Sequence, residues 1–510
     1  MPRKELPIGI QTFATIRGGD YYYVDKTGYA MQVARGRTCF LSRPRRFGKS
    51  LFLDTLAELF AGNKALFEGL ACYDAWDWDT VYPVVRLGFA EGSPGDSAAL
   101  AERIVVQLQR NADRLGLGPM PDYQIPDLFI WLIQEAEKVH GRQVVVLVDE
   151  YDKPILDNLT DAQVATDMRR GLRDVYSVLK GQEAHLRFVM LTGVSKFSHL
   201  NNLDDISLSP RYSAVCGYTE HDLDTVFAPE LDGVDRNEVR EWYNGYSWLG
   251  EPVYNPYDLL LFFRDRSFEA YWFETGTPLS LLQTLTSRDV YVPGLGGLEA
   301  TRSLLSTFDI GDMSTEALLF QTGYLTIGST RQVLGAMRYQ LRFPNREVRA
   351  SLTEAFLKAW SPDGSKAITR STPLPDLLEA GDLTGVKALL TSHFASIPHD
   401  WYRNNKIAQA EGYYASVFYT FFASVGLDTV AEDTSSTGRL DLAVRHGGQV
   451  FLFEFKAVDS PQGTALAQIK DKAYAAKYLA EGVRVHLVGV EFSRTERNIV
   501  TWDTQTTTAE

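Results

Sequence analysis

The chain has 510 residues, of which 45% are apolar and 23% are charged, and its formal net charge is −14 at pH 7. This length predicts two to four domains, and the acidic balance excludes a surface that binds nucleic acid over its whole area, so such binding needs a local basic groove or a bound metal ion. No apolar run approaches the roughly 18 residues of a membrane span, and the first residues lack an apolar signal core. We therefore expect a cytoplasmic protein with no membrane contact.

The first motif with chemical meaning is the sequence SRPRRFGKS at residues 42–50. It follows an apolar run that predicts a strand and precedes a segment with the period of a helix. Such a loop presents backbone N–H groups and a helix N-terminus to an anion, while a lysine binds the outer phosphates and a hydroxyl binds magnesium. Lys49 and Ser50 supply these two groups. A standard phosphate loop has glycine where this chain has Arg43, so the motif alone leaves open a basic turn that only caps a helix.

A second motif follows where five apolar residues, 144–148, run into Asp149 and Glu150. The run predicts a strand buried on both faces, and open α/β sheets bind ligands at the C-terminal ends of their strands. In phosphate-loop ATPases the first acid holds magnesium and the second polarises the attacking water. An ordinary core strand followed by a solvated acidic turn is the alternative for this motif alone. The two motifs in this order predict nucleotide binding.

Alternating strands and helices in this part of the chain predict a parallel sheet with right-handed crossovers. We expect its other strands at residues 82–89, 186–191 and 213–219. The strand at 186–191 ends in a polar segment, where Thr192 and Ser195 are candidates to sense the γ-phosphate, with a simple turn as the alternative. The arginines between 169 and 173 are candidates for a finger on a neighbouring nucleotide, but a solvated helix face explains them better.

The middle of the chain predicts two smaller parts between an ATPase domain at 1–218 and a last domain at 376–510. Residues 219–301 are helical and rich in aromatic residues, which predicts a small lid. Residues 302–375 contain a helix that ends at Tyr324, two short strands, another helix and a Pro-, Gly-, Ser- and Thr-rich linker. This order is typical of a winged-helix fold. Because no basic recognition helix is visible, we expect this region to pack on the ATPase domain and not to bind DNA.

The last domain predicts a second site, on a β-hairpin. One strand carries Asp441, and the other carries Glu454 and Lys456 after a turn at 446–448. Alternation along a strand places Glu454 and Lys456 on one face, and Asp441 can approach Glu454 from the paired strand. Two carboxylates on one magnesium ion, with a lysine to stabilise charge or orient water, suit phosphodiester hydrolysis. A half-exposed strand with a surface ion pair is the alternative for Glu454 and Lys456 alone.

Segments on either side of the hairpin add to this site. Glu411, at the start of a predicted helix, is a candidate third metal carboxylate, and a later helix carries Lys470 and Lys472, which can meet a phosphate backbone. We expect the last strand at 483–490, and the resulting order of helix, two strands, helix and strand is typical of nucleases. The histidines lack metal-ligand spacing, the three cysteines lack CxxC spacing, and no GxSxG motif occurs, so zinc and serine hydrolases find no support.

Over nearly its whole length the chain resembles the bacterial proteins that join an AAA-ATPase-like domain to a C-terminal nuclease domain of the PD-(D/E)xK superfamily. Because these relatives usually have an arginine-rich loop, Arg43 departs from phosphate loops in general and not from this family. The resemblance is carried by YVDKT at 23–27, RPRRFGKS at 43–50, LVDEYDKP at 147–154, LTGVS at 191–195, NLDDI at 202–206, GRLD at 438–441 and FEFK at 453–456, with Gln468 and Tyr474 in step.

The resemblance implies an α/β fold with an ATPase core of the additional-strand class, in which Lys49 and Ser50 bind phosphate and magnesium, Asp149 binds magnesium and Glu150 acts on water. The nuclease superfamily contains members that have lost activity. The predicted nucleotide-binding residues are Arg43, Pro44, Arg45, Arg46, Phe47, Gly48, Lys49, Ser50, Asp149 and Thr192. The predicted nuclease residues are Asp441, Glu454 and Lys456, with Glu411, Gln468 and Tyr474 in support and Mn²⁺ able to replace Mg²⁺.

These observations predict an ATP-hydrolysing enzyme whose nucleotide state regulates a magnesium-dependent nuclease that acts on DNA or RNA. The alternative is a nucleotide-dependent switch or interaction protein whose inactive nuclease fold only binds nucleic acid. A third reading is a remodelling ATPase that forms a ring, for which no convincing arginine finger is visible. The sequence leaves open whether the chain forms a homo-oligomer.

Overall fold

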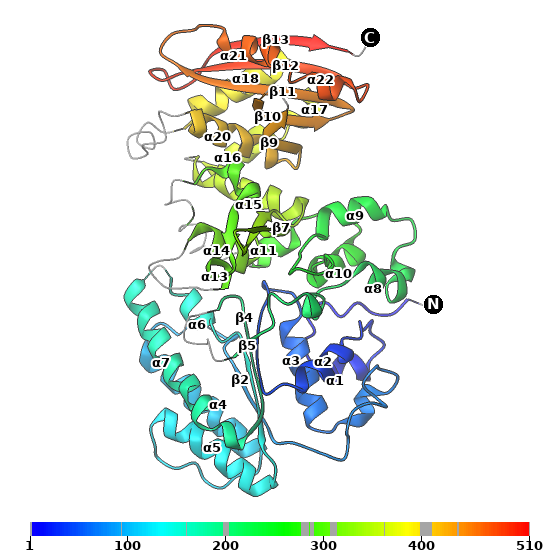
Figure 1. Ribbon diagram of the computed structural model, residues 1–510, viewed down its shortest axis with the longest axis vertical. Coiled ribbons are helices and arrows are strands. Elements are labelled where there is room, and N and C mark those ends of the chain that lie inside the picture. The colour runs from blue at the N-terminus through cyan, green and yellow to red at the C-terminus, as the bar shows by residue number, and fades with distance from the viewer. Residues whose placement is uncertain are drawn as a thin grey trace. The chain divides into compact units, whose positions relative to one another are not determined.

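The chain folds into two compact units (Figure 1). Unit 1 comprises Met1–Ser280 and Glu299–Asn345, and unit 2 comprises Leu281–Leu298 and Arg346–Glu510. These units do not test the expected division into four parts, which stays a prediction. Among the described residues, no helix is both long and apolar enough to cross a membrane. The computed structural model describes residues 3–92, 94–159, 161–196, 203–276, 285, 290–306, 314–361, 363–397, 411–435 and 438–508.

Unit 1 is built on a parallel five-stranded sheet with the order β2-β3-β4-β1-β5. β4 lies between β1, which precedes the phosphate loop, and β3, which ends in the two acids. This confirms a parallel ATPase-type sheet with an additional strand. Most side chains of β3 and β4 are buried, as expected for strands covered on both faces. The strands are β1 (Thr38–Ser42), β2 (Val84–Gly88), β3 (Val144–Asp149), β4 (Leu186–Gly193) and β5 (Asp204–Asp205).

The prediction of a strand at residues 213–219 is wrong. These residues form turns, Tyr218 makes only an isolated bridge with Tyr254, and β5 pairs with β1 instead. Gly217 has a left-handed φ of 92°, and a Cβ there would lie 2.7 Å from the side chain of Val253. The extended run is therefore broken at a position that only glycine tolerates.

Helices cover both faces of this sheet, with α1 to α3 on one side and α4, α5 and α7 on the other (Figure 1). α4 and α5 lie between β2 and β3 in the chain, and α7 lies between β3 and β4, in keeping with the expected alternation of strands and helices. The helices are α1 (Phe13–Gly18), α2 (Thr27–Ala34), α3 (Lys49–Phe60), α4 (Ser97–Arg114), α5 (Ile125–His140), α6 (Lys153–Leu156) and α7 (Ala162–Gly181), with 3-10 turns η1 (Lys64–Phe67), η2 (Glu183–His185) and η4 (Pro210–Tyr212).

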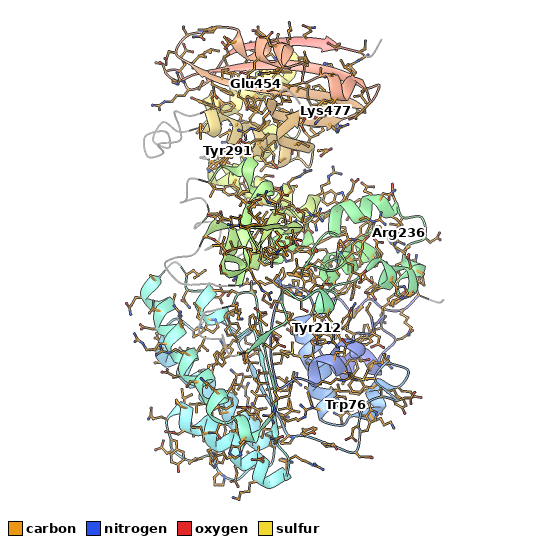
Figure 2. The ribbon with its side chains drawn as sticks, in the orientation of Figure 1. Trp76, Tyr212, Arg236, Tyr291, Glu454 and Lys477 are labelled. Carbon is orange, nitrogen blue, oxygen red and sulfur yellow. The ribbon has the colours of Figure 1, made fainter. Side chains whose placement is uncertain are left out.

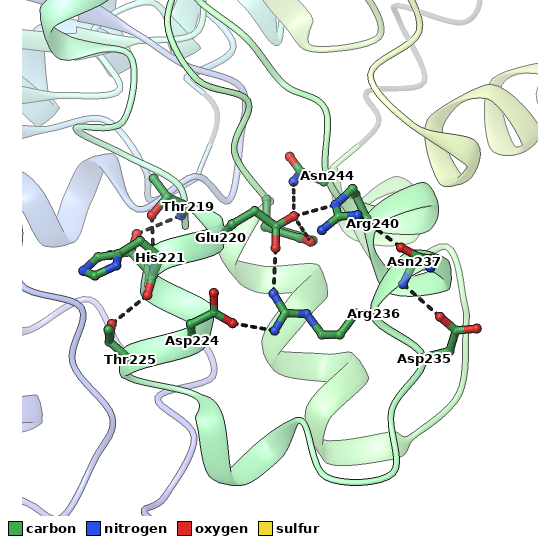
Figure 3. A network of polar contacts seen from close by, with 12 residues as sticks. Thr219, Glu220, His221, Asp224, Thr225, Asp235, Arg236, Asn237, Arg240 and Asn244 are labelled. Carbon is green, nitrogen blue, oxygen red and sulfur yellow. Dashed lines mark hydrogen bonds and ion pairs between the residues drawn. The ribbon is translucent and has the colours of Figure 1, made fainter.

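The next part of unit 1 is helical and is held together by a network around Glu220 (Figure 3). Arg240 Nε and Arg236 NH2 donate to its two carboxylate oxygens at 2.8 and 2.7 Å, and the Tyr254 hydroxyl adds a third bond. Although burial opposes ionisation, these hydrogen bonds lower the pKa of Glu220 to about 2. The network ties together α8 (Glu220–Thr225), α9 (Arg236–Tyr243) and Tyr254, two residues before the start of α10 (Pro256–Asp265). η5 (Ala228–Glu230) lies between α8 and α9.

A small antiparallel sheet with the order β6-β8-β7 completes unit 1. The helix before Tyr324 and the two strands after it occur as expected, but the helix that follows them belongs to unit 2. The elements are α11 (Tyr271–Gly276), β6 (Glu299–Thr301), α13 (Arg302–Ser306), α14 (Thr315–Thr322), β7 (Thr326–Val333) and β8 (Ala336–Arg342).

Unit 2 contains a mixed five-stranded sheet with the order β13-β12-β11-β10-β9, in which β11 and β12 are parallel and the other pairs are antiparallel. Residues 413–423 of the apolar helix α20 are all buried, and Phe418 packs on Phe453 and Phe455 of β11. The strands are β9 (Asp428–Ser435), β10 (Gly438–His446), β11 (Gln449–Val458), β12 (Arg484–Ser493) and β13 (Ile499–Thr507). The helices are η6 (Val292–Gly297), α15 (Arg346–Ala359), α16 (Gly364–Ser371), α17 (Leu374–Glu379), α18 (Leu383–Ala395), α20 (Glu411–Ala423), α21 (Thr464–Asp471) and α22 (Ala476–Leu479).

The hairpin of β10 and β11 is confirmed, but two strands of this sheet were not predicted. The strand expected at 483–490 is β12, and it is not the last, because β13 follows it along one edge. β9 forms the opposite edge. Both edge strands are rich in Thr and Asp, so their sequences lack the apolar run that marks a buried strand.

Candidate functional sites

The loop between β1 and α3 folds around the ammonium group of Lys49. Gly48 takes a left-handed φ of 88°, which lets α3 begin directly at Lys49. Lys49 Nζ donates to the carbonyl oxygens of Arg43 and Pro44, each at 3.0 Å. These bonds hold the buried amine inside the loop, where a phosphate group would meet it together with the first N–H groups of α3.

The Arg43 side chain supports the loop from beneath. Its guanidinium group donates to the carbonyl oxygens of Ser42, Ser207 and Tyr212 at 2.8, 3.0 and 2.9 Å, and it stacks 4.0 Å from the centre of the Trp248 ring. Full burial lowers the pKa of Arg43 to about 10. The arginine that replaces the usual glycine is thus a structural anchor, so its predicted part in nucleotide binding would fall to its backbone.

The acids after β3 meet the polar end of β4. Asp149 Oδ1 accepts hydrogen bonds from Thr192 Oγ1 at 2.7 Å and from the Glu150 backbone N–H at 3.0 Å. Glu150 has a positive φ of 49°, and its side chain lines a cavity beside the loop. Burial raises the pKa of Glu150, and the nearby charge of Lys49 opposes that rise. The structure therefore brings the predicted Thr192, Asp149, Glu150 and Lys49 into one site.

Ser195, the other candidate for a γ-phosphate sensor, is engaged elsewhere. Its backbone N–H and its hydroxyl donate to Asp152 Oδ2 at 2.6 and 2.7 Å, and Val194 N–H donates to the same oxygen at 2.9 Å. Burial raises the pKa of Asp152. Asp152 was not singled out in the sequence, where it reads as part of the same acidic turn. It joins the turn after β3 to the end of β4 and so fixes the position of Glu150.

A cavity of about 390 Å³ lies over the phosphate loop, within the size range of small-molecule sites. Its lining includes loop residues 45–50, Glu150 and Lys153. It also includes Ile10, Leu260 and the rings of Tyr218 and Tyr257. Cationic groups and apolar or aromatic groups in one cavity match the polyphosphate and the base of a nucleotide.

Two of the three α7 arginines behave as a solvated helix face. Arg170 and Arg173 are exposed and lie 3.3 and 3.7 Å from the carboxylates of Asp167 and Asp174 on the same helix. Neither arginine lines the cavity.

The second site lies on the β10–β11 hairpin. Leu442 pairs with Phe453, which places Asp441 beside Glu454 on the neighbouring strand. Glu454 is labelled in Figure 2. Asp441 Oδ2 accepts a hydrogen bond of 2.7 Å from the Phe455 N–H. Glu454 Oε1 accepts bonds from Lys456 Nζ, at 3.3 Å, and from the side-chain amide of Gln468 on α21. Three segments of the chain thus bring the predicted Asp441, Glu454, Lys456 and Gln468 together.

The electrostatics of this site favour a bound cation. Glu454 is 1% exposed, and its Oε2 has no hydrogen-bond partner among the described residues. Burial and the neighbouring Asp441 raise the pKa of Glu454 to about 7, and burial also raises the pKa of Asp441. A buried carboxylate oxygen without a partner, next to a second carboxylate, fits a divalent cation. Within the described ranges no group of three or more His, Cys, Asp or Glu side chains is arranged for a metal, so two carboxylates and water would have to suffice, as Mg²⁺ often accepts.

Comparisons with known proteins match the two domains that carry these sites. The family model described as predicted AAA-ATPase matches residues 7–202, and that of the PD-(D/E)XK nuclease superfamily matches residues 409–502. A protein from the vnfD 5′ region of Azotobacter chroococcum mcd 1 is 57% identical over 509 residues, which is 98% of each chain. The chain belongs to this family of AAA-ATPase-like and PD-(D/E)XK nuclease-superfamily proteins. Among solved structures, the Aeropyrum pernix ORC1 protein in complex with DNA matches at a TM-score of 0.26 and 13% identity, over 65% of this chain and 93% of that one.

The remaining residues predicted for the PD-(D/E)XK domain take supporting positions. Glu411, the first residue of α20, is half exposed, and its Oε1 lies 3.9 Å from Lys456 Nζ and accepts a 3.4 Å bond from the Ala457 N–H. It therefore lies beside the lysine and does not complete a three-carboxylate cluster. The Tyr474 hydroxyl donates to the Arg439 carbonyl at 2.9 Å and so ties the segment after α21 to β10. Lys470 and Lys472 are exposed.

Glu491 is a residue of this domain that sequence reasoning missed. In the parallel register of β11 and β12 it lies opposite Lys456. Its side chain is fully buried and accepts hydrogen bonds from the backbone N–H groups of Gln462 and Thr464 at 2.7 and 2.8 Å. Although burial opposes ionisation, these bonds lower the pKa of Glu491 to about 2. Glu491 fixes the start of α21 and hence the approach of Gln468 to Glu454. The sequence signal that could have identified Glu491 is an acid set between the apolar residues Val490 and Phe492 in a predominantly apolar strand.

Tyr291 also lies at the PD-(D/E)XK site, although it precedes the matched residues 409–502. A Cβ on Gly412 would be 3.7 Å from the Tyr291 ring, so the ring packs on the first turn of α20, next to Glu411. Burial, together with the carboxylates of Glu432 and Asp441, raises the pKa of Tyr291. No sequence signal pointed to it, because its segment was assigned to the lid.

The raised pKa of Glu454 predicts a pH-dependent stability effect. In the metal-free protein this side chain stabilises the fold when protonated, below its ordinary pKa of 4.5, and the contribution is lost as the pH rises through about 7. Glu454→Gln should therefore leave stability nearly unchanged at pH 4.5 and increase it by up to about 3 kcal/mol at pH 8. Calorimetric unfolding of both proteins in a chelator at the two pH values measures this difference. If the free energies of unfolding of the two proteins differed by the same amount at both pH values, the raised pKa of Glu454 would be contradicted.

Proposed function

We propose that this protein binds and hydrolyses ATP and that its nucleotide state regulates metal-dependent cleavage of nucleic acid by the PD-(D/E)XK domain. The observation that carries the nuclease part is the buried Glu454 oxygen without a described partner, beside Asp441 and within reach of Lys456. An ion pair that served only stability would leave no such oxygen, because an unsatisfied buried acceptor costs about 1–3 kcal/mol. Function therefore explains the arrangement better than stability does.

In the ATPase part, each group has a role that its position supports. Lys49 would move from the loop carbonyls to the outer phosphates, and the N–H groups at the start of α3 would bind the same anion. Ser50 and Asp149 would hold Mg²⁺, with Thr192 orienting Asp149 through its 2.7 Å hydrogen bond. Glu150, with a pKa raised by burial, would accept a proton from the attacking water.

In the nuclease part, Asp441 and Glu454 would hold Mg²⁺ or Mn²⁺. Such a cation polarises the scissile phosphate and makes a bound water more acidic. Lys456 lies on the same face as Glu454, where its ammonium group can orient the water and neutralise charge on the phosphate. Gln468 fixes Glu454 Oε1, which leaves Oε2 for the cation. The substrate is a phosphodiester of DNA or RNA.

A cleavage panel tests the proposal. Labelled single- and double-stranded DNA and RNA are incubated with the protein and Mg²⁺ or Mn²⁺, with ATP, with ADP and without nucleotide. We expect cleavage of at least one substrate, at a rate that ATP changes. ATP hydrolysis without any cleavage would instead support the alternative, a nucleotide-dependent switch whose nuclease fold only binds nucleic acid, and retention of the same labelled strands on the protein would then identify that partner.

A further inference from the structure

Two cations in the wall of the cavity that Glu150 also lines share one carboxylate. Arg45 belongs to the phosphate loop, and Lys153 begins α6, three residues after Glu150. Arg45 NH2 lies 3.5 Å from Asp157 Oδ1, and Lys153 Nζ lies 2.6 Å from Asp157 Oδ2. Both cationic side chains line the cavity. Asp157 therefore holds an arginine from the loop and a lysine from the acidic turn against each other.

The local backbone fixes this arrangement. The Lys153 N–H donates to the Glu150 carbonyl at 3.1 Å, which sets the start of α6 relative to the acid. Lys153 Nζ makes a second bond, of 3.2 Å, to the Gly92 carbonyl, and Asn158 Nδ2 ties the end of α6 to the Pro94 carbonyl at 3.1 Å. The three charged side chains of the cluster are 19–29% exposed, so solvent screens them less than it screens an ordinary surface ion pair.

The charges of the cluster do not cancel. One carboxylate, Asp157, faces two cations, so these three side chains together carry one positive charge, whereas the charge of Lys49 is opposed by that of Glu150. Arg45, Lys153 and Lys49 line the same cavity, so the outermost phosphate of a nucleotide bound there would meet these cations together. A surplus cation at that point complements the γ-phosphate of ATP and finds no such partner in ADP.

We propose that Arg45 and Lys153 bind the terminal phosphate of ATP and stabilise its charge during hydrolysis, within the same chain that supplies Lys49. This inference rests on the ATP hydrolysis proposed above. The water oxygen forms a bond to the γ-phosphorus, and the bond from that phosphorus to the β,γ-bridging oxygen breaks, leaving its electron pair on ADP. Glu150 accepts the proton that the water loses, and the products are ADP and inorganic phosphate. Asp157 is the positioning residue that holds both cations ready.

The consequence is that one chain suffices for catalysis. An arginine supplied to a phosphoryl transfer site is worth about 10³–10⁵ in turnover. In ring-forming ATPases a neighbouring subunit provides it, whereas here both cations lie on the loop and the turn of the chain's own site. Two of the three α7 arginines that the sequence offered for a neighbour, Arg170 and Arg173, are exposed and pair with acids of their own helix.

Kinetic and binding measurements on Arg45→Gln, Lys153→Gln and the double variant test the inference. We expect turnover to fall about 10²-fold in each single variant, since two cations share the stabilisation, while ADP affinity stays at the wild-type level. The preference for a non-hydrolysable ATP analogue over ADP should be lost. Lys153→Arg, which keeps the charge, should recover most of the turnover. Arg37→Gln is the matched control, because Arg37 is an exposed arginine that pairs with Glu183 and does not line the cavity.

Mixing distinguishes a cation of the same chain from one of a neighbour. An equimolar mixture of the Arg45→Gln protein and the Lys49→Ala protein should hydrolyse ATP no faster than the sum of the two proteins measured separately. Wild-type turnover per chain should not change on dilution. Restored activity in the mixture, or wild-type turnover in the double variant, would overturn the inference. If the wild-type protein binds ATP without hydrolysing it, the proposed hydrolysis fails, and the preference for the ATP analogue over ADP still decides whether the two cations recognise the terminal phosphate.

Discussion

Lys456→Ala is expected to reduce metal-dependent cleavage of nucleic acid by about 10²–10³-fold, the usual cost of removing one preorganised group that stabilises transition-state charge. Lys456 Nζ lies 3.3 Å from Glu454 Oε1 and 3.9 Å from Glu411 Oε1, so it is held at the carboxylate pair by two anionic neighbours. Cleavage of the best substrate, measured at saturating Mg²⁺ or Mn²⁺, gives the size of the effect.

Loss of the lysine must be separated from loss of the fold. Arg445→Gln removes a cation from β10 that pairs with Glu481 at 2.7 Å on the surface of the same unit, so it is a matched control that should cleave like the wild type. Metal binding by Lys456→Ala should persist, because Asp441 and Glu454 remain. Equal cleavage by Lys456→Ala and the wild type would mean that another group serves the reaction.

Local sequence signals explain which parts of this molecule were predictable. The phosphate loop, the acidic strand β3 and the β10–β11 hairpin were found because each couples an apolar run to polar residues at a fixed spacing. The hairpin residues Asp441 and Glu454 meet because strand alternation and register alone determine their faces. The edge strands β9 and β13 carry no such signal, and they were missed.

The side-chain partners could not be read from the sequence, because they join segments far apart in the chain. Arg43 finds its carbonyl partners at Ser207 and Tyr212, and Arg45 meets Asp157 of the segment after β3. In each case the residue type was visible, but its role depends on which backbone carbonyl or carboxylate the fold brings to it.

Glu150→Gln is expected to bind ATP and to hydrolyse it about 10²–10⁴-fold more slowly, the range typical of a lost general base. The amide keeps the size of the side chain and removes one negative charge from a buried site that Asp149 already makes acidic, so ATP affinity should be retained or increased.

Lys49→Ala is the complementary change. It removes a charged hydrogen-bond donor to the phosphates and should weaken ATP binding about 10- to 100-fold.

Together these two variants separate nucleotide binding from hydrolysis in the control of the nuclease. At an ATP concentration above the Kd of Glu150→Gln and well below that of Lys49→Ala, the first variant stays ATP-bound and the second stays mostly nucleotide-free. Their cleavage rates should then differ most, with the rate of the cycling wild-type protein between them. The direction of the difference identifies which nucleotide state activates the PD-(D/E)XK domain. Identical cleavage rates in both variants would show that the ATPase site does not control the nuclease, and wild-type hydrolysis by Glu150→Gln would assign the water to a different base.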